Sequence, residues 1–236
     1  MKFKSMLTTI NAKTSKGESL GYLTGIMYLA PANIVEEVNL CPMASKGCKK
    51  ACLYTAGRGR YQNTKNARIK KTILFRDDLE FFMNSLVWSI LKVVKQAKRK
   101  GLIPAIRLNG TSDIRWEKIR NKQGKNIFEL FPAIQFYDYT ADYTRIEALT
   151  GTWKNYHLTF SRKESRANHI QAERLLAMGV NVAAVYRDSA RAVNNLNAID
   201  GDLHDLRFLD PKGGRIVALR AKGEAKKDQS GFVIHN

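Results

Sequence analysis

The sequence predicts an α/β fold with a mostly parallel sheet, arranged as a partial (β/α) barrel in one domain over residues 1–236. Short apolar segments rich in Val, Ile and Leu alternate with segments of helical periodicity. Strands separated by helices form right-handed βαβ units and hence a parallel sheet. The strand segments are apolar nearly throughout, as in sheets that are covered on both faces. A flat, doubly wound sheet is the alternative.

The elements of the first half follow in a regular order. Residues 22–31 form the first predicted strand, and the spacing of apolar residues predicts helices over 66–78 and 79–100. Apolar runs predict buried strands over 102–110 and 133–141. Each strand is therefore followed by chain long enough to cross over to a parallel neighbour.

The second half repeats this alternation. Residues 156–161 alternate like a strand, 167–179 form a helix that ends in glycine, and 180–188 and 215–223 are further strands. No internal repeat or proline-rich linker divides the chain, which favours one domain. No Gly-x-Gly-x-x-Gly or P-loop motif follows any strand, so a dinucleotide or P-loop site has little support.

Polar residues gather where the predicted strands end, which is where chemistry sits in parallel α/β folds. We expect catalytic groups among Asn109, Asp113, Tyr137 and Asp138. Any one of these residues is also at home in a turn or a helix cap.

The net charge of +19 favours a polyanionic partner, with nucleic acid first and an anionic membrane second. The excess lies almost wholly in residues 1–125, which carry 25 basic and 8 acidic side chains. No apolar run reaches the roughly 18 residues of a membrane span. Within the basic segment 46–76, we expect nucleic-acid contacts from Arg58, Arg60, Tyr61, Lys65, Arg68, Lys70 and Lys71. A solvated helix face is the alternative.

All three cysteines fall in the loop 41–52, with the spacing Cys-x6-Cys-x3-Cys. Clustered, odd-numbered cysteines favour a metal site in a reducing cytosol over a disulfide framework. Cys48 and Cys52 would share a face of a helical turn, and Gly47 would let Cys41 fold back toward them. An iron–sulfur cluster is the first expectation, and zinc, with a fourth ligand from His157, His169, His204 or His235, is the second. Three buried cysteines without metal are the third.

Four aspartates between Asp200 and Asp210 form an acidic cluster in this basic chain. Paired carboxylates can hold Mg²⁺ for phosphoryl transfer, which would make the protein a metal-dependent nuclease. A turn-rich loop with aspartate caps is the simpler interpretation.

Several stretches resemble the gene-product-88 family of phage proteins, among them LCPMASKGCKKACLYTAGRGR, RLNGTSDIRWE and IDGDLHDLRFLDP. The resemblance runs from about residue 20 to 233. It implies a phage protein that acts in the cytoplasm of a bacterial host.

A looser resemblance is to the radical S-adenosylmethionine (SAM) enzymes, which have a partial (β/α) barrel and a [4Fe–4S] cluster. It makes Cys41, Cys48 and Cys52 the cluster ligands, although the usual spacing there is Cys-x3-Cys-x2-Cys. Asn109, Gly110 and Thr111 stand where those enzymes have Gly-Gly-Glu, which contacts SAM. Ser161 and Arg187 would meet its ribose and carboxylate. The resemblance implies a radical-SAM-like enzyme that acts on nucleic acid or a nucleotide. The alternatives are a nucleic-acid-binding protein with a structural zinc or iron–sulfur site, and the nuclease.

Overall fold

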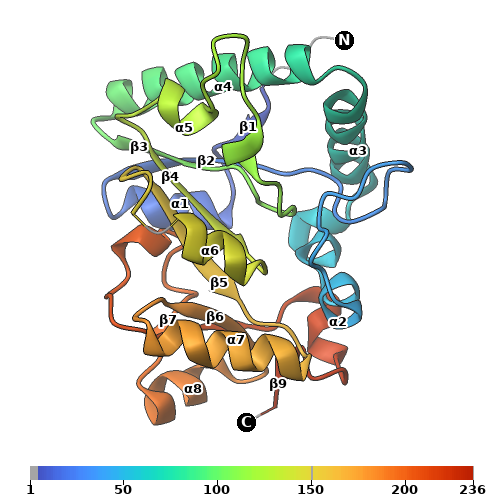
Figure 1. Ribbon diagram of the computed structural model, residues 1–236, viewed down its shortest axis with the longest axis vertical. Helices are drawn as coiled ribbons and strands as arrows, with labels where there is room; N and C mark the ends of the chain where they lie inside the picture. Colours follow the sequence, from blue (N-terminus) through green and yellow to red (C-terminus); the bar gives the residue numbers. More distant parts are fainter. Residues whose placement is uncertain (1–4, 150, 236) are drawn as a thin grey trace. The chain divides into compact units, whose positions relative to one another are not determined.

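The computed structural model describes residues 5–149 and 151–235, which form a mixed α/β fold around a mostly parallel sheet (Figure 1). The sheet has nine strands in the order β1-β2-β3-β4-β5-β6-β8-β7, with β9 paired to β6. It is not closed into a barrel. The mostly parallel α/β sheet expected from the sequence is confirmed.

The strands are β1 (Leu7–Thr8), β2 (Tyr22–Met27), β3 (Ile103–Arg107), β4 (Gln135–Thr140), β5 (Tyr156–Ser161), β6 (Val182–Tyr186), β7 (Ile199–Asp200), β8 (Ile216–Arg220) and β9 (Val233–Ile234). The helices are α1 (Ala12–Glu18), α2 (Lys46–Lys50), α3 (Gln62–Asp77), α4 (Leu79–Lys100), α5 (Ile127–Leu130), α6 (Tyr143–Leu149), α7 (Arg166–Ala177) and α8 (Ser189–Leu196).

Six of the nine strands follow one another across the sheet in chain order. β2, β3, β4, β5, β6 and β8 lie side by side in the order in which the chain makes them. A doubly wound sheet reverses direction at a switch point, and in this sheet β7 lies outside β8, so the order reverses at that edge. The pairs β2–β3, β3–β4, β5–β6 and β6–β8 are parallel. β1 breaks the pattern, because it pairs antiparallel to β2.

The described chain divides into two compact units, and the chain passes between them several times. The first comprises residues up to Cys41, then Lys65–Asp138 and Trp153–His157. The second comprises Pro42–Thr64, Tyr139–Thr152 and Leu158 onward. Because no single cut in the sequence separates the units, no linker marks them.

The first unit is built on α4, which packs against β1, β2 and β3 (Figure 1). Asp78 caps its N-terminus by accepting the Phe81 N–H at 2.9 Å, and Gly101 ends it in the left-handed region with φ at 65°. Its inner face buries Phe82, Leu86, Ile90 and Val93 in one core with Trp116 and Phe136. Burying large apolar side chains completely stabilises a fold by about 1.5–3 kcal/mol each.

The second unit holds smaller apolar clusters. Phe160 of β5, Leu175 of α7 and Val182 of β6 pack in one, and Ala184, Ala192 and Ala218 pack between α8 and the strands in another. A third joins Ala51, which follows α2, to Ala221, Phe232 and Val233. The cysteine loop is therefore packed against the C-terminal segment of the chain.

Each predicted strand and helix has a counterpart; β5 has the predicted bounds, and the other predicted strands are shorter than expected. The strand expected over 22–31 ends at Met27, and the chain beyond it is irregular. The predicted boundary between two helices near residue 78 is confirmed, since α3 ends at Asp77 and α4 begins at Leu79. The sequence did not predict β1, β7, β9, α1, α5, α6 or α8. In the described ranges, no helix is both long and apolar enough to cross a membrane.

Candidate functional site

The loop that follows β3 is organised by the side chain of Asn109. Its Oδ1 atom accepts hydrogen bonds from Ser112 Oγ at 2.9 Å, the Ile114 N–H at 3.0 Å and the indole N–H of Trp116 at 3.0 Å. Its amide Nδ2 donates to the Ile114 carbonyl at 3.0 Å. Asn109 is buried, and these four bonds use most of the amide's capacity. The side chain therefore positions the loop.

Asp138 lies at the end of β4, fully buried. Its Oδ1 atom accepts the Asn109 backbone N–H at 2.6 Å, and its Oδ2 atom accepts the hydroxyl of Tyr156 at 3.3 Å. Tyr137, the preceding residue, is also fully buried. Asp113 is half-buried, and its N–H donates to the Leu40 carbonyl at 2.7 Å. The structure thus brings Asn109 and Asp138 together in the first unit.

The segment Asn109-Gly110-Thr111 is tied to the chain that leaves β2. The Gly110 N–H donates to the Met27 carbonyl at 3.0 Å, and a Cβ atom at Gly110 would collide with that oxygen. Thr111 Oγ1 donates to the Leu29 carbonyl at 2.6 Å. Cys41 Sγ lies 3.7 Å from the Thr111 carbonyl oxygen. This predicted ligand is therefore held at the carboxyl ends of two neighbouring parallel strands, β2 and β3.

The helix α2 places Cys48 in the second unit. Ser45 caps this helix by accepting the Cys48 N–H on Oγ at 3.1 Å. Glu164, beyond the end of β5, accepts Ser45 Oγ at 2.5 Å and the Gly47 N–H at 2.8 Å. A Cβ atom at Gly47 would collide with Ser230 Oγ and would lie 2.8 Å from Phe232 Cβ. Glycine is required here for close packing, at a φ that other residues can adopt.

The carboxylate of Glu164 is held in its charged form. Partial burial opposes ionisation, but the hydrogen bonds from Ser45 and Gly47 outweigh it, so the pKa of Glu164 lies below its usual value. A carboxylate at the first turn of a helix also complements the exposed N–H groups there. Glu164 thus fixes the start of α2, and with it the position of Cys48.

Cys52 lies just beyond α2, which ends at Lys50. Its sulfur accepts the Tyr54 N–H at 3.5 Å, and its carbonyl accepts Thr55 Oγ1 at 2.8 Å. N–H donors to sulfur are a recurrent feature around bound thiolates. All three cysteines are half-buried thiols outside any disulfide.

The donor chemistry of the loop fits a soft metal, since it offers three thiols. Cys41 belongs to the first unit, and Cys48 and Cys52 belong to the second. Among the residues that the structure describes, no three side chains of His, Cys, Asp or Glu gather into a group that could hold a metal ion.

Ser161 and Arg187 face partners within the second unit. Ser161 Oγ accepts the ammonium of Lys163 at 3.0 Å. The guanidinium of Arg187 donates to the Asp228 carbonyl at 3.3 Å and lies 3.0 Å from His235 Nε2. Arg162 holds the same C-terminal segment by donating to the Gly231 carbonyl at 3.1 Å. These cations line the ends of β5 and β6 and anchor β9.

The basic segment predicted to bind nucleic acid is divided by the fold. Arg58, Arg60 and Tyr61 are exposed in the second unit, with the Arg60 guanidinium 5.8 Å from the Tyr61 ring centre. Lys65 and Lys70 lie in the first unit on α3, and Lys70 is exposed.

Two other members of this segment, Arg68 and Lys71, are buried in the first unit. Arg68 stacks on the ring of Tyr28 with 4.9 Å to its centre, and Lys71 Nζ donates to the Met6 carbonyl at 3.3 Å. Burial, with the nearby charge of Arg68, lowers the pKa of Lys71 to about 8. These two cations support the fold from inside.

Two aspartates of the acidic cluster, Asp202 and Asp210, face nearby cations. Asp202 pairs with the Lys222 ammonium and accepts the Arg220 N–H at 2.7 Å. Asp210 lies 3.2 Å from the guanidinium of the fully buried Arg207. Burial nevertheless outweighs that cation and raises the pKa of Asp210 to about 6. The nearby charge of Asp205 adds to that rise, so the carboxylates of Asp205 and Asp210 do interact.

The sequence did not predict a role for Glu164 or Tyr156. Nor did it predict that Gly47 is a tightly packed position. Glu164 lay in a polar strand end, but nothing in the sequence connects it to a helix more than a hundred residues earlier. Tyr156 opens a strand, where an aromatic residue is ordinary. The roles of Glu164 and Tyr156 become visible only in the hydrogen bonds that they form in the folded chain.

The fold and this site define an α/β protein whose first parallel strand leads into a three-cysteine loop. The chain matches the family described as Gene product 88 over residues 4–236, and it therefore belongs to that family of phage proteins. This confirms the resemblance found in the sequence motifs. Neither a curated protein nor a solved structure matches the chain.

Proposed function

We propose that Cys41, Cys48 and Cys52 hold an iron–sulfur cluster, and that the protein is a radical-SAM-like enzyme acting on nucleic acid or a nucleotide in the cytoplasm of a bacterial host. One observation carries the proposal. The cysteine loop follows β2, which pairs parallel to β3 and is the first of six strands that lie side by side in chain order. In (β/α) barrels the loops after the strands build the active site.

The chain's own residues have definable roles in this proposal. Thr111 and Glu164 fix the segments that carry Cys41 and Cys48. The N–H of Tyr54 supports the charge on the Cys52 sulfur. Cys41, Cys48 and Cys52 would hold the cluster, which when bound would supply the electron for reductive cleavage of SAM. The protein positions these groups and excludes water.

A structural metal in a nucleic-acid-binding protein is the second candidate. It is favoured by the packing of Cys48 against Ala51, Phe232 and Val233, which makes the loop part of a small apolar cluster. A metal bound at this loop would hold the loop against the C-terminal segment. The basic charge of the chain supports a nucleic-acid partner in either case.

Product analysis under anaerobic conditions separates the two candidates. The enzyme proposal predicts that the dithionite-reduced, iron-loaded protein converts SAM to 5′-deoxyadenosine, and that oligonucleotides increase the yield. Cys48→Ser should abolish the product, whereas Met43→Ala, an exposed change in the same loop, should not. A loaded protein that neither binds nor cleaves SAM, with or without oligonucleotides, would leave the structural metal as the better account.

A further inference from the structure

We propose that the outer face of α4 binds single-stranded nucleic acid, with phosphates on its cations and a base against Trp88. The α4 outer face is defined as Phe81, Trp88, Leu91, Lys92, Lys95 and Arg99. This inference does not depend on the cysteine loop or on the enzyme activity proposed above. It can therefore fail or succeed independently.

These residues lie on one side of the helix. Positions 81, 88, 92, 95 and 99 are separated by steps of seven, four, three and four residues, which keeps them on a single stripe. The opposite side, with Phe82, Leu86 and Ile90, is buried in the core. On the outer side Trp88 is 47% exposed, a large fraction for an indole. The exposed aromatic is thus not needed to fill the core.

The charge of this face is entirely positive. Residues 81–100 contain five basic side chains and no acidic one. Lys100 is paired with Glu18 at 3.0 Å. Within the described chain, neither Lys95 nor Arg99 forms an ion pair with a carboxylate. Two neighbouring cations without acidic partners in the described ranges, Lys95 and Arg99, favour a polyanion.

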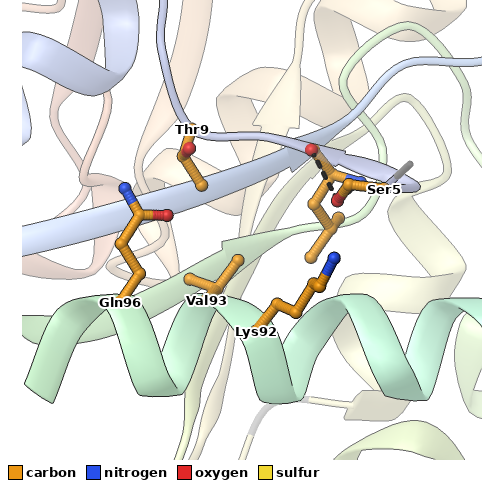
Figure 2. Close-up of a pocket in the computed structure, with 6 residues that line it drawn as sticks. Ser5, Thr9, Lys92, Val93 and Gln96 are labelled. Atoms are coloured by element: carbon orange, nitrogen blue, oxygen red, sulfur yellow. Dashed lines mark hydrogen bonds between the residues drawn. The ribbon is translucent and has the colours of Figure 1, made fainter.

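Trp88 and Lys92 form the centre of the proposed surface. The Lys92 ammonium lies 3.6 Å from the centre of the Trp88 ring. Lys92 also lines a pocket of about 350 Å³, with Ser5, Leu7, Thr9, Val93 and Gln96 (Figure 2). In Figure 2, Lys92 and Gln96 rise from α4 toward the segment that carries Ser5 and Thr9. An aromatic ring, a cation and polar groups are therefore adjacent, as recognition of one nucleotide requires.

The arrangement favours a single strand over a membrane or a duplex. Helices that bind membranes insert a continuous apolar face, and the continuous apolar face of α4 is already used in the core. On the outer face, Trp88 and Leu91 are interleaved with cations. An exposed ring can stack on an unpaired base, whereas the bases of a duplex are already stacked on each other.

Fluorescence anisotropy with a labelled oligothymidylate, at several salt concentrations, tests the charge component. Each phosphate contact on a single strand contributes about 0.7 to the slope of log affinity against log salt. Lys95→Gln with Arg99→Gln should therefore lower that slope by about 1.4. The matched control, Lys212→Gln with Lys226→Gln, removes two exposed cations of the second unit and should leave the slope nearly unchanged. Equal losses in both double variants would overturn the proposal.

The Trp88 variants test stacking. Trp88→Ala should weaken binding by about 5- to 150-fold, the range measured for loss of one stacked base, while Trp88→Phe should retain most of the affinity. Melting temperatures of all variants establish that they fold. Preference for an equally long duplex, or for phosphatidylserine vesicles over the oligonucleotide, would contradict the assignment, as would full affinity in Trp88→Ala.

Discussion

The sulfur of Cys41 lies 3.7 Å from the carbonyl oxygen of Thr111. This contact joins the chain that follows β2 to the loop that follows β3. Two backbone hydrogen bonds reinforce it, from Gly110 to Met27 and from Asp113 to Leu40. A thiol that donates to a carbonyl is held in place without being buried completely, and it can exchange its proton for a metal.

Glu164 should control the stability of α2. Glu164→Gln keeps the shape of the side chain but removes the charge that accepts the Ser45 hydroxyl and the Gly47 N–H. Charged hydrogen bonds contribute about 1.5–3 kcal/mol, and partial exposure places the expected loss near the lower end. Chemical unfolding measures it. Glu173→Gln, an exposed change on α7, is the control and should cost little.

The pKa of Glu164 also predicts how the stability of the fold changes with pH. Because the pKa of Glu164 is lower in the folded chain than in the unfolded chain, its stabilisation is present above the ordinary value of 4.5 and is lost as pH falls below it. The difference in unfolding free energy between the wild type and Glu164→Gln should therefore shrink between pH 5 and about pH 3. A difference that is independent of pH would show that the charge is not involved.

Asn109 should act on stability through its loop. Asn109→Ala leaves the Ile114 N–H and the indole N–H of the buried Trp116 without their acceptor. Unsatisfied buried donors cost about 1–3 kcal/mol each, so we expect a loss of several kcal/mol and a lower melting temperature. Asn195→Ala, at an exposed position, is the control. An unchanged melting temperature in Asn109→Ala would mean that the loop is held by other contacts.

The lowered pKa of Lys71 predicts that the fold becomes more stable as pH rises above about 8. Its pKa is about 8 in the folded chain against 10.5 when unperturbed, so the unfolded chain binds more protons between these values. Unfolding free energy should increase by about 3 kcal/mol across this window because of Lys71. Lys71→Met should remove that increase, as seen by denaturant titrations at pH 8 and pH 10. Lys70→Met, its exposed neighbour, should retain it.

Asp202 tests the nuclease alternative. Its carboxylate accepts the Arg220 N–H and pairs with Lys222, so we expect Asp202→Asn to lower stability by about 1 kcal/mol. We expect no Mg²⁺-dependent cleavage of plasmid or single-stranded DNA in the wild type. Cleavage that requires Mg²⁺ and disappears in Asp202→Asn, while Glu224→Gln retains it, would instead establish the acidic cluster as a catalytic site.

The sheet could be predicted from sequence because its strands are short apolar runs bounded by polar loops. The spacing of Leu86, Ile90 and Val93 likewise identified α4. The short edge strand β1 could not be predicted, because two residues carry no periodicity. Nor could the helix α8, whose eight residues include only two large apolar side chains, Val193 and Leu196. Their positions depend on pairing with β2 and packing on β8.

The sequence allowed us to predict where the residues of the candidate site lie. It predicted their roles less well. The polar ends of β3 and β4 do bring Asn109 and Asp138 together. What the sequence lacks is the direction of each hydrogen bond, since an asparagine that holds a loop and one that faces a ligand look alike in sequence. Arg68 and Lys71 illustrate the same limit, because basic residues on α3 were expected on its surface and these two are buried.

The most direct test of the central claim is iron, sulfide and zinc analysis of the full-length protein purified without oxygen. An iron–sulfur cluster on the cysteine loop predicts about four irons and four sulfides per chain, a brown colour that bleaches with dithionite, and loss of both in Cys48→Ser. A colourless wild-type protein, with about one zinc or no metal per chain, would contradict it.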